Sequence, residues 1–202
     1  MSVGLAQPRN IQPVAGVRVG AIDGGIRKSS GEDLALFEIS SDSTIAGVFT
    51  TNKARAAPVE VALDHLHLQK AGQRGKLRAM VVNSGNANAG VGQAGIDDCR
   101  QVCQKVADEL GIATESVIPF STGVIGERLP VHKFEQSVGA CVQTLNEDNW
   151  LAAARAIMTT DTIPKAVSRV INVGESDQVT ICLLYTSPSP RDRTRSRMPS
   201  SA

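Results

Sequence analysis

The feature that most constrains the fold is a short apolar run that a tight polar connection joins to an amphipathic segment. Residues 78–83 form an apolar run that ends in turn residues, which is typical of a buried strand. Between residues 96 and 110 apolar side chains recur every three or four positions, which predicts a helix that Gly111 ends. The connection at 83–90 is rich in asparagine and glycine, which tolerate positive φ, and this favours a tight strand-to-helix turn.

Strand and helix signals recur along the chain without strict alternation and without an internal repeat. The patterns predict strands at 33–39 and 45–50 and helices over 134–145 and 148–158, whereas residues 1–14 are polar and expected to be loosely held. Aromatic residues are scarce, with one Trp, one Tyr and four Phe, so the core must consist of Val, Ile, Leu and Ala. The length of 202 residues is sufficient for one domain with a sizeable core.

The charge balance and the cysteine pattern exclude several classes of protein. The 21 basic and 20 acidic residues give a net charge of +1, and leaving out residues 183–202, with their four arginines and one aspartate, shifts it to −2. Neither value favours nucleic-acid binding. The four cysteines contain no C-x-x-C pair, no apolar run is long enough for a membrane span, and the N-terminus does not resemble a secretory signal. A cytoplasmic protein with reduced thiols is expected.

The segment Ser121–Gly126 contains the residue pair that points most directly to chemistry. The hydroxyl of Thr122 adjoins the backbone N–H of Gly123. Two donors aimed at one point stabilise the oxyanion that develops in acyl transfer. Taken alone, the segment can also be an ordinary strand-to-helix turn between Pro119 and Pro130, so the rest of the chain decides between the two interpretations.

Thr122 and Gly123 belong to one of five segments that follow one another in a specific order. The segments are Gly-Val-Phe-Thr-Thr-Asn running on to Ala-Ala-Pro-Val (47–59), Val-Val-Asn-Ser-Gly-Asn-Ala-Asn-Ala (81–89), Ser-Thr-Gly-Val-Ile-Gly with Leu-Pro (121–130), Met-Thr-Thr-Asp-Thr (158–162) and Pro-Lys (164–165). Together they closely resemble the ornithine acetyltransferase family, also called bifunctional glutamate N-acetyltransferase, of arginine biosynthesis. The likeness extends from about residue 17 to about residue 181.

The resemblance implies a fold and roles for individual residues. Members of this family have a mixed α/β fold, a layered α-β-β-α sandwich, of which this chain would supply most of the first subunit and so be incomplete. They cleave their own backbone before a threonine, which becomes the nucleophile and is activated by its free α-amine. On the family's motifs, Thr122 and Gly123 would form the oxyanion hole and Thr159 would bind substrate.

The resemblance also implies a reaction and its partners. An acetyl group would pass from N-acetylornithine to glutamate through an acetyl-threonine intermediate, with no dissociable cofactor, although some family members also accept acetyl-coenzyme A as the donor. The implied protein partner is the C-terminal (β) subunit cut from the same precursor, which would give a hetero-oligomer. Neither nucleic acid nor a membrane is expected as a partner.

The chain departs from the family pattern near residue 182. Two short strands are expected at 170–173 and 178–181, but no Ala-Thr-Met cleavage site follows, so the nucleophilic threonine and a second substrate-binding lysine are absent. We therefore expect an N-terminal part over residues 1–182. Residues 183–202, rich in Ser, Pro and Arg and without apolar periodicity, are expected to be a non-native, disordered tail. A basic arm for nucleic acid is the alternative interpretation of the tail.

Two other functions stay open. Self-processing aminopeptidases have a similar layered fold and also use an N-terminal serine or threonine, so a hydrolase is one alternative. An inactive fragment with no chemistry of its own is the other. Because the nucleophile is missing, the chain alone is expected to show neither transferase activity nor self-cleavage.

Other polar residues have weaker claims to a role. Lys165 is interpreted either as a partner for a substrate carboxylate or as a solvated lysine. Asp161 either supports the threonines beside it or caps the local turn. The 83–90 connection lacks the sequence of a phosphate-binding loop. The three histidines are not spaced as metal ligands.

Overall fold

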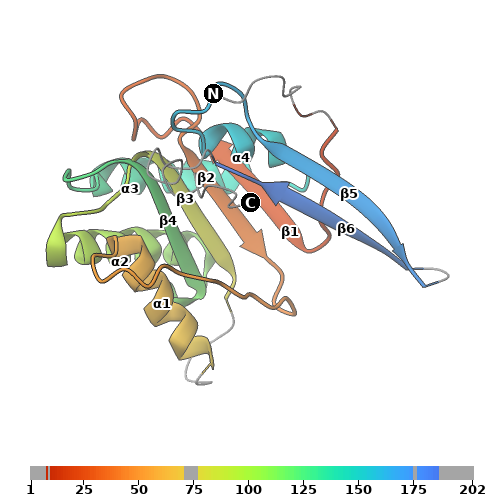
Figure 1. Cartoon of the computed structure of the whole chain (residues 1–202), viewed down its shortest axis with the longest axis horizontal. Helices are drawn as coiled ribbons and strands as arrows, with labels where there is room; N and C mark the ends of the chain where they lie inside the picture. Colours follow the sequence, from red (N-terminus) through yellow and green to blue (C-terminus); the bar gives the residue numbers. More distant parts are fainter. Residues whose placement is uncertain (1–7, 9, 71–76, 175–176, 187–202) are drawn as a thin grey trace, which may run out of the picture.

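The computed structural model describes residue 8 and residues 10–70, 77–174 and 177–186. The elements, shown in Figure 1, are β1 (Val17–Ile22), β2 (Leu34–Ile39), α1 (Ala57–Lys70), β3 (Ala79–Asn86), α2 (Gly92–Leu110), a 3₁₀ turn (Thr114–Ser116), β4 (Val117–Val124), α3 (Val131–Gln143), α4 (Trp150–Ala156), β5 (Ala166–Val173) and β6 (Asp177–Leu184). None of the helices in these described ranges is long and apolar enough to cross a membrane.

Four strands form the main sheet in the order β1-β2-β3-β4. The pairs β1–β2 and β2–β3 are antiparallel, whereas β3 and β4 are parallel. A parallel pair needs a crossover connection, which α2 provides. Because parallel strands end at the same edge of a sheet, Ser84 and Gly85 of β3 lie opposite Thr122 and Gly123 of β4. The Ser121–Gly126 segment therefore begins at the edge where both strands end.

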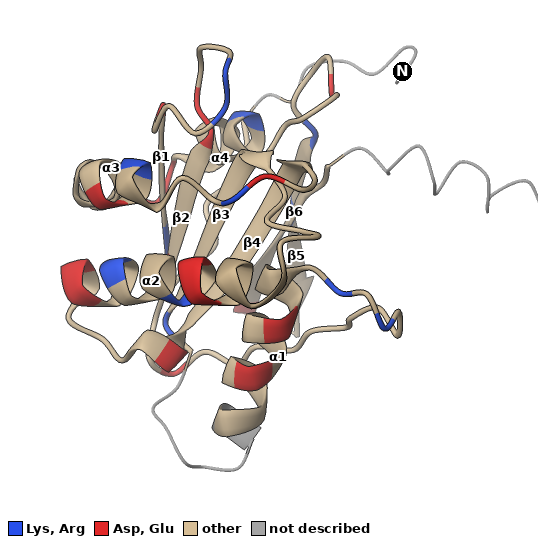
Figure 2. Cartoon of the chain, turned by 90° about the vertical axis from the view of Figure 1, so that its left-hand side faces the viewer, with Lys and Arg blue, Asp and Glu red and all other residues tan. Residues whose placement is uncertain are grey.

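Helices α1, α2 and α3 cover one face of this sheet, and Figure 2 shows them in front of the strands. The apolar stripe predicted between residues 96 and 110 is buried in the core, where Cys99, Val102 and Val106 pack with Leu36 of β2. Gly111 ends α2 with a φ of 65°, as predicted, and its N–H satisfies the last carbonyl groups of the helix.

The opposite face of the sheet packs against α4 and a second, two-stranded sheet of β5 and β6. Trp150 of α4 packs with Val19 of β1 and lies beside Phe37, with ring centroids 6.0 Å apart. Cys182 and Leu184 of β6 contact the same cluster. Figure 1 shows the β5–β6 pair to the right of the four-stranded sheet, on the side opposite α1 and α2, and Figure 2 shows it behind that sheet. The expected mixed α/β fold, built in layers of helices and two sheets, is therefore confirmed.

The face of β5 and β6 turned away from this cluster is apolar and exposed. Its side chains alternate along both strands, and their exposed fractions lie between 43% and 57% for Val167, Ile171, Val173, Val179, Ile181 and Leu183. Exposed apolar faces of this kind are typical of surfaces that another chain segment covers.

The structure contradicts one local prediction and adds two elements that were not predicted. The strand expected at 45–50 is wrong: the segment is a loop that pairs with no strand, Val48 is fully exposed, and only Ile45 and Phe49 pack against the core. Neither β1 nor α1 was predicted. The boundary expected at residue 182 stays a prediction: Leu183 and Leu184 pair with β5, and the rest of the expected tail, residues 187–202, lies outside the described residues.

Candidate functional site

A cavity of about 820 Å³ opens at the edge of the sheet where β3 and β4 end. The carboxyl ends of parallel strands are the usual place for ligand sites in open α/β sheets. The lining comes from the β1–β2 loop, the ends of β3 and β4, the β4–α3 connection with the first turn of α3, and the segment after α4. Segments that are far apart in the sequence thus meet around one space.

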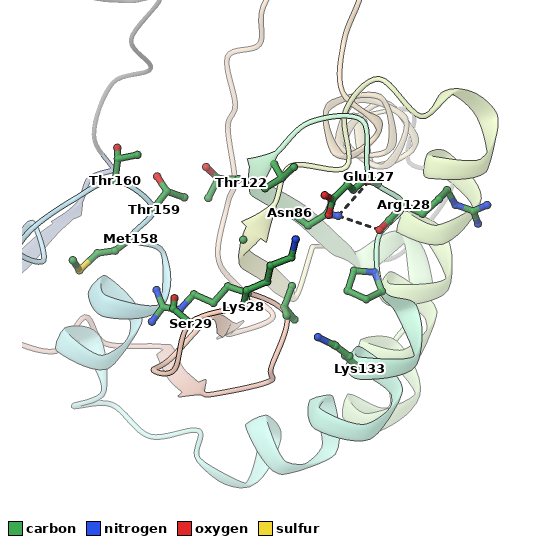
Figure 3. A pocket seen from close by; sticks show the side chains of 16 residues that line it. Lys28, Ser29, Asn86, Thr122, Glu127, Arg128, Lys133, Met158, Thr159 and Thr160 are labelled. Carbon is green, nitrogen blue, oxygen red and sulfur yellow. Dashed lines mark hydrogen bonds between the residues drawn. The ribbon is translucent and has the colours of Figure 1, made fainter.

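Three residues predicted for the site, Thr122, Gly123 and Thr159, line this cavity together. Thr122 is half-buried at the end of β4, and Gly123 beside it is exposed. Thr159 belongs to the segment after α4, and Figure 3 shows it on the same side of the cavity as Thr122. The residues at 122 and 123 are therefore open to solvent, and the cavity can hold a molecule of amino-acid size.

Next to the cavity three backbone segments stack closely, an arrangement that the sequence analysis missed. Gly123 has a φ of 138°, and a Cβ added to it would lie 2.3 Å from the carbonyl carbon of Gly85. Gly85 has a φ of 102°, and a Cβ added to it would lie 2.5 Å from the Cβ of Arg27. Glycine alone can both adopt these positive φ angles without strain and leave room for the neighbouring backbone. The glycines in the Asn-Ser-Gly-Asn and Ser-Thr-Gly motifs were the signal that could have predicted the stack.

Asparagine side chains fix the strand ends that carry the site. Asn86 donates from Nδ2 to the carbonyl groups of Glu127 (3.2 Å) and Arg128 (3.0 Å), shown as dashed lines in Figure 3. Its Oδ1 accepts the N–H of Asn88 at 2.7 Å, and Asn83 donates to the carbonyl group of Asn86 at 2.9 Å. Asn88 has a φ of 47°, so the tight turn with positive φ predicted between strand and helix is confirmed.

Two carboxylates hold the β1–β2 loop against the rest of the site. Asp33 is fully buried and accepts the N–H groups of Gly24 at 2.7 Å and of Arg27 at 2.8 Å. Glu32 accepts two hydrogen bonds from the guanidinium group of Arg155 in α4, at 2.9 and 3.1 Å. This interaction lowers the pKa of Glu32. The loop is thus tied to α4, and so to the segment that carries Thr159.

Two basic residues of the lining differ in how their charge is compensated. Arg128 forms a two-pronged ion pair with Asp98 of α2, with N–O distances of 2.6 and 2.5 Å, which raises the pKa of Arg128. Figure 3 shows its guanidinium group pointing away from the cavity. Lys133, the third residue of α3, donates instead to the carbonyl oxygen of Gly25 in the β1–β2 loop.

Comparison with known proteins places the whole arrangement in a family. The ArgJ family profile matches residues 18–184, which is most of the chain. The chain belongs to the ArgJ family. It is similar to the crystal structure of the arginine biosynthesis bifunctional protein argJ from Bacillus halodurans, at 30% identity and a TM-score of 0.78, over 88% of this chain and 89% of that one.

A second ArgJ-type structure agrees with the first. It is the ornithine acetyltransferase from Mycobacterium tuberculosis, crystallised in complex with ornithine, with 33% identity and a TM-score of 0.77. The match covers 89% of this chain and 93% of that chain. The expected family resemblance and fold are thereby confirmed.

Other candidate residues of this ArgJ-family chain lie outside the cavity lining. Lys165 pairs with Asp161 at 2.7 Å, and its Nζ lies 5.6 Å from the ring centre of Tyr185, so its charge has a partner within the chain. His65 is buried, with Nδ1 2.7 Å from the carbonyl oxygen of Val117. Among the residues that the structure describes, no three His, Cys, Asp or Glu side chains are grouped to hold a metal ion.

A second hollow, of about 680 Å³, adjoins the cavity at Thr122. Its walls are mainly apolar and include Phe37 of β2, Val82 of β3 and Phe120 of β4, with further residues from the 48–50 segment and the end of β6. Phe120 is 44% exposed. Because Thr122 lines both spaces, a segment lying in the apolar hollow would reach the residues predicted for oxyanion binding.

Proposed function

We propose that this chain is the N-terminal part of an enzyme that transfers an acetyl group from N-acetylornithine to glutamate in arginine biosynthesis. Membership of the ArgJ family and similarity to a structure named ornithine acetyltransferase support the reaction class. The observation that carries the proposal is the meeting of Thr122, Gly123 and Thr159 in one cavity of about 820 Å³. We assign the first two to oxyanion stabilisation and the third to substrate binding.

The proposed chemistry requires a threonine nucleophile at the N-terminus of a chain, and no Ala-Thr-Met cleavage site that would supply one occurs in the given sequence. In the proposed reaction a threonine Oγ attacks the acetyl carbonyl carbon of N-acetylornithine, the C–N bond breaks, and ornithine leaves with the proton on its amine. The amine of glutamate then attacks the acetyl-threonine ester and releases the threonine. Both steps pass through a tetrahedral oxyanion, which the Thr122 hydroxyl and the Gly123 N–H would stabilise by about 3–4 kcal/mol per well-placed donor.

We further propose that the nucleophile belongs to a C-terminal (β) subunit that forms a cytoplasmic hetero-oligomer with residues 1–182. The subunit would arise by self-cleavage of a longer precursor. Two features support a covering partner: the exposed apolar face of β5 and β6, and the apolar hollow that adjoins Thr122. Covering such surfaces removes apolar area from water, which stabilises an assembly.

The test is an acetyl-transfer assay with isotope-labelled N-acetylornithine and unlabelled glutamate. The chain alone is expected to form no labelled N-acetylglutamate. Mixed with a separately expressed, threonine-led C-terminal subunit from a family member, it is expected to form the product. Acetyl transfer by the chain alone would refute the proposal that a separate C-terminal subunit supplies the nucleophile. Release of free acetate in place of N-acetylglutamate would favour a hydrolase.

Within the active mixture, Thr122→Val tests the oxyanion assignment. Loss of one oxyanion donor is expected to lower kcat by about 10²- to 10³-fold, whereas Thr122→Ser keeps the hydroxyl and should retain most of the activity. Thr114→Val is the matched control, because Thr114 lies in the 3₁₀ turn outside the cavity lining. Full activity of Thr122→Val would contradict the assignment.

A further inference from the structure

The cavity lining carries an excess of positive charge. Arg27, Lys28 and Lys133 contribute three cationic groups, and Glu127 is the one carboxylate among the described lining residues. Arg128 also lines the cavity, but Asp98 compensates its charge. A cavity with such a lining attracts anions, because its partly enclosed walls screen charges less than open water does.

Carboxylates near the β1–β2 loop are engaged by other donors. The two oxygens of Asp23 accept the N–H groups of Gly31 and Gly25, each at 3.0 Å, and these bonds, with a smaller contribution from the charge of Arg27, lower the pKa of Asp23. Glu32 accepts the guanidinium group of Arg155. Asp33 accepts two backbone N–H groups of the loop. These groups hold the shape of the loop. Lys133, by contrast, donates to a backbone carbonyl oxygen, which carries no net charge to compensate its own.

Lys133 adds a second feature that favours an anion. It lies in the first turn of α3, where the structure shows no acidic residue and no side-chain cap. A helix N-terminus carries partial positive charge, so a lysine there is unfavourable unless an anion is close by. The bond from Lys133 to the Gly25 carbonyl oxygen keeps this lysine beside the loop that carries Lys28.

The two lysines approach the cavity from different elements. Lys28 comes from the β1–β2 loop and is exposed, and Lys133 comes from α3. Figure 3 shows Lys28 lying between Thr159 on one side of the view and Lys133 on the other. An anion held by both lysines would therefore share the cavity with Thr122 and Thr159.

We propose that Lys28 and Lys133 form a carboxylate subsite that anchors the amino-acid substrate while its acetyl or amino group faces Thr122. This inference rests on the proposed acetyl transfer, because it takes the ligand of the cavity to be a carboxylate-bearing amino acid. Lysine binds a carboxylate as a compact point charge through up to three donors. The pair acts in binding and positioning and takes no part in bond making.

Direct binding to the full chain tests the subsite without requiring catalysis. The probes are N-acetylornithine, its methyl ester, which lacks the carboxylate, and sulfate, each titrated by calorimetry into the native chain. We expect N-acetylornithine to bind at least about tenfold more tightly than its ester, because one charge-assisted bond is worth about that factor or more. Lys28→Gln and Lys133→Gln should each remove most of this difference.

Two variants control for structural effects. Lys53→Gln removes an exposed lysine outside the cavity lining and should leave the affinities unchanged. Lys133→Arg keeps the charge and should restore the preference for the carboxylate, which a variant that had simply misfolded would not do. Thermal unfolding of each variant checks that it is folded.

Each other outcome would overturn the subsite. Equal binding of N-acetylornithine and its ester by the native chain, or an unchanged preference in both glutamine variants, would remove the evidence for a lysine-bound carboxylate. Sulfate binding as tightly as N-acetylornithine would indicate a general anion site. Failure of acetyl transfer in the separate assay would refute the proposed reaction and leave the binding result standing, so the two failures are distinguishable.

Discussion

Gly85 and Gly123 allow the ends of β3 and β4 to lie close together beside Thr122. Gly123 contacts Gly85 through backbone atoms, and Gly85 contacts Arg27 in the same way. The N–H of Gly123 is the second proposed oxyanion donor, and its position depends on this contact. Substitution at 123 therefore affects both stability and the proposed chemistry.

Gly123→Ala is expected to destabilise the chain more than Gly126→Ala does. Both glycines have positive φ, of 138° and 86°, which costs an L-residue about 1–3 kcal/mol. At Gly126 nothing lies within 4 Å of an added Cβ, whereas at Gly123 the new Cβ would clash with the backbone of Gly85. Urea denaturation of both variants measures the difference, and equal losses of free energy of unfolding would contradict the stack.

At the residue scale, the sequence predicted which residues meet at the cavity better than it predicted the backbone contacts beside them. Thr122, Gly123 and Thr159 could be named from their motifs, and all three line the cavity. The backbone approach of Arg27 to Gly85 could not be predicted, because it depends on where the β1–β2 loop folds in space. The same holds for Lys28 and Lys133, which are separated by more than one hundred residues and meet only through the fold.

Among the elements, the β1–β2 loop and the segment that follows α4 line the cavity, and Glu32 and Arg155 join that loop to α4. The side chains of these two residues are 30% and 44% exposed, so solvent screens much of their attraction. Their pairing nevertheless restricts the movement of the loop that carries Lys28 relative to the segment that carries Thr159.

Glu32→Gln is expected to lower stability by no more than about 1 kcal/mol at neutral pH. The pKa of Glu32 is lowered in the folded state from its usual 4.5, so its contribution is fully present above pH 4.5 and is lost as the pH falls through the lowered value. Urea denaturation at pH 7 and at acid pH should therefore show a difference from the native chain that shrinks on acidification.

The matched control for Glu32→Gln is Glu135→Gln on the exposed surface of α3, which should change stability little at either pH. Added salt should also reduce the effect of Glu32→Gln, because the pair is partly exposed. A difference that stays constant across pH and salt would show that the glutamine acts through packing and not through charge.

Periodicity predicted the helices that bury a continuous stripe, and it failed for α1 and for the 45–50 segment. The helices α2 and α3 carry such stripes, and each contains most of its predicted range. The helix α1 was not predicted because its apolar residues form no single stripe. In its N-terminal half, Val59, Val61, Ala62 and Leu63 follow one another closely and so point to different sides of the helix. The 45–50 segment resembles a strand in composition, but the fold offers it no neighbouring strand.

At the scale of the whole molecule, the burial of the cysteines can be used to test whether the core is accessible to solvent. Cys99, Cys103 and Cys141 are buried, and Cys182 is partly exposed. A hydrogen bond with Cys99 and burial raise the pKa of Cys103, and burial raises the pKa of Cys141 to about 12. Thiols react as thiolates, so two effects slow the reaction of Cys103 and Cys141: burial keeps reagents away, and the raised pKa keeps the thiols protonated.

Alkylation by iodoacetamide at pH 8 is expected to modify Cys182 first, although burial raises its pKa as well. The other three cysteines should react only at the rate at which the chain unfolds. Mass spectrometry of timed samples follows each site, and Cys182→Ser should abolish the early phase alone. Simultaneous modification of all four cysteines would show that the core is not closed as described.

The cavity draws its walls from most of the length of the chain, between residues 26 and 160. A fragment that lacked any one of these segments would lose part of the lining. Ligand affinity is therefore linked to cooperative folding: a compound that binds there raises the melting temperature of the entire unit, by an amount that grows with the logarithm of its concentration. A core substitution far from the cavity would weaken apparent binding simply by lowering the fraction of molecules that are competent to bind.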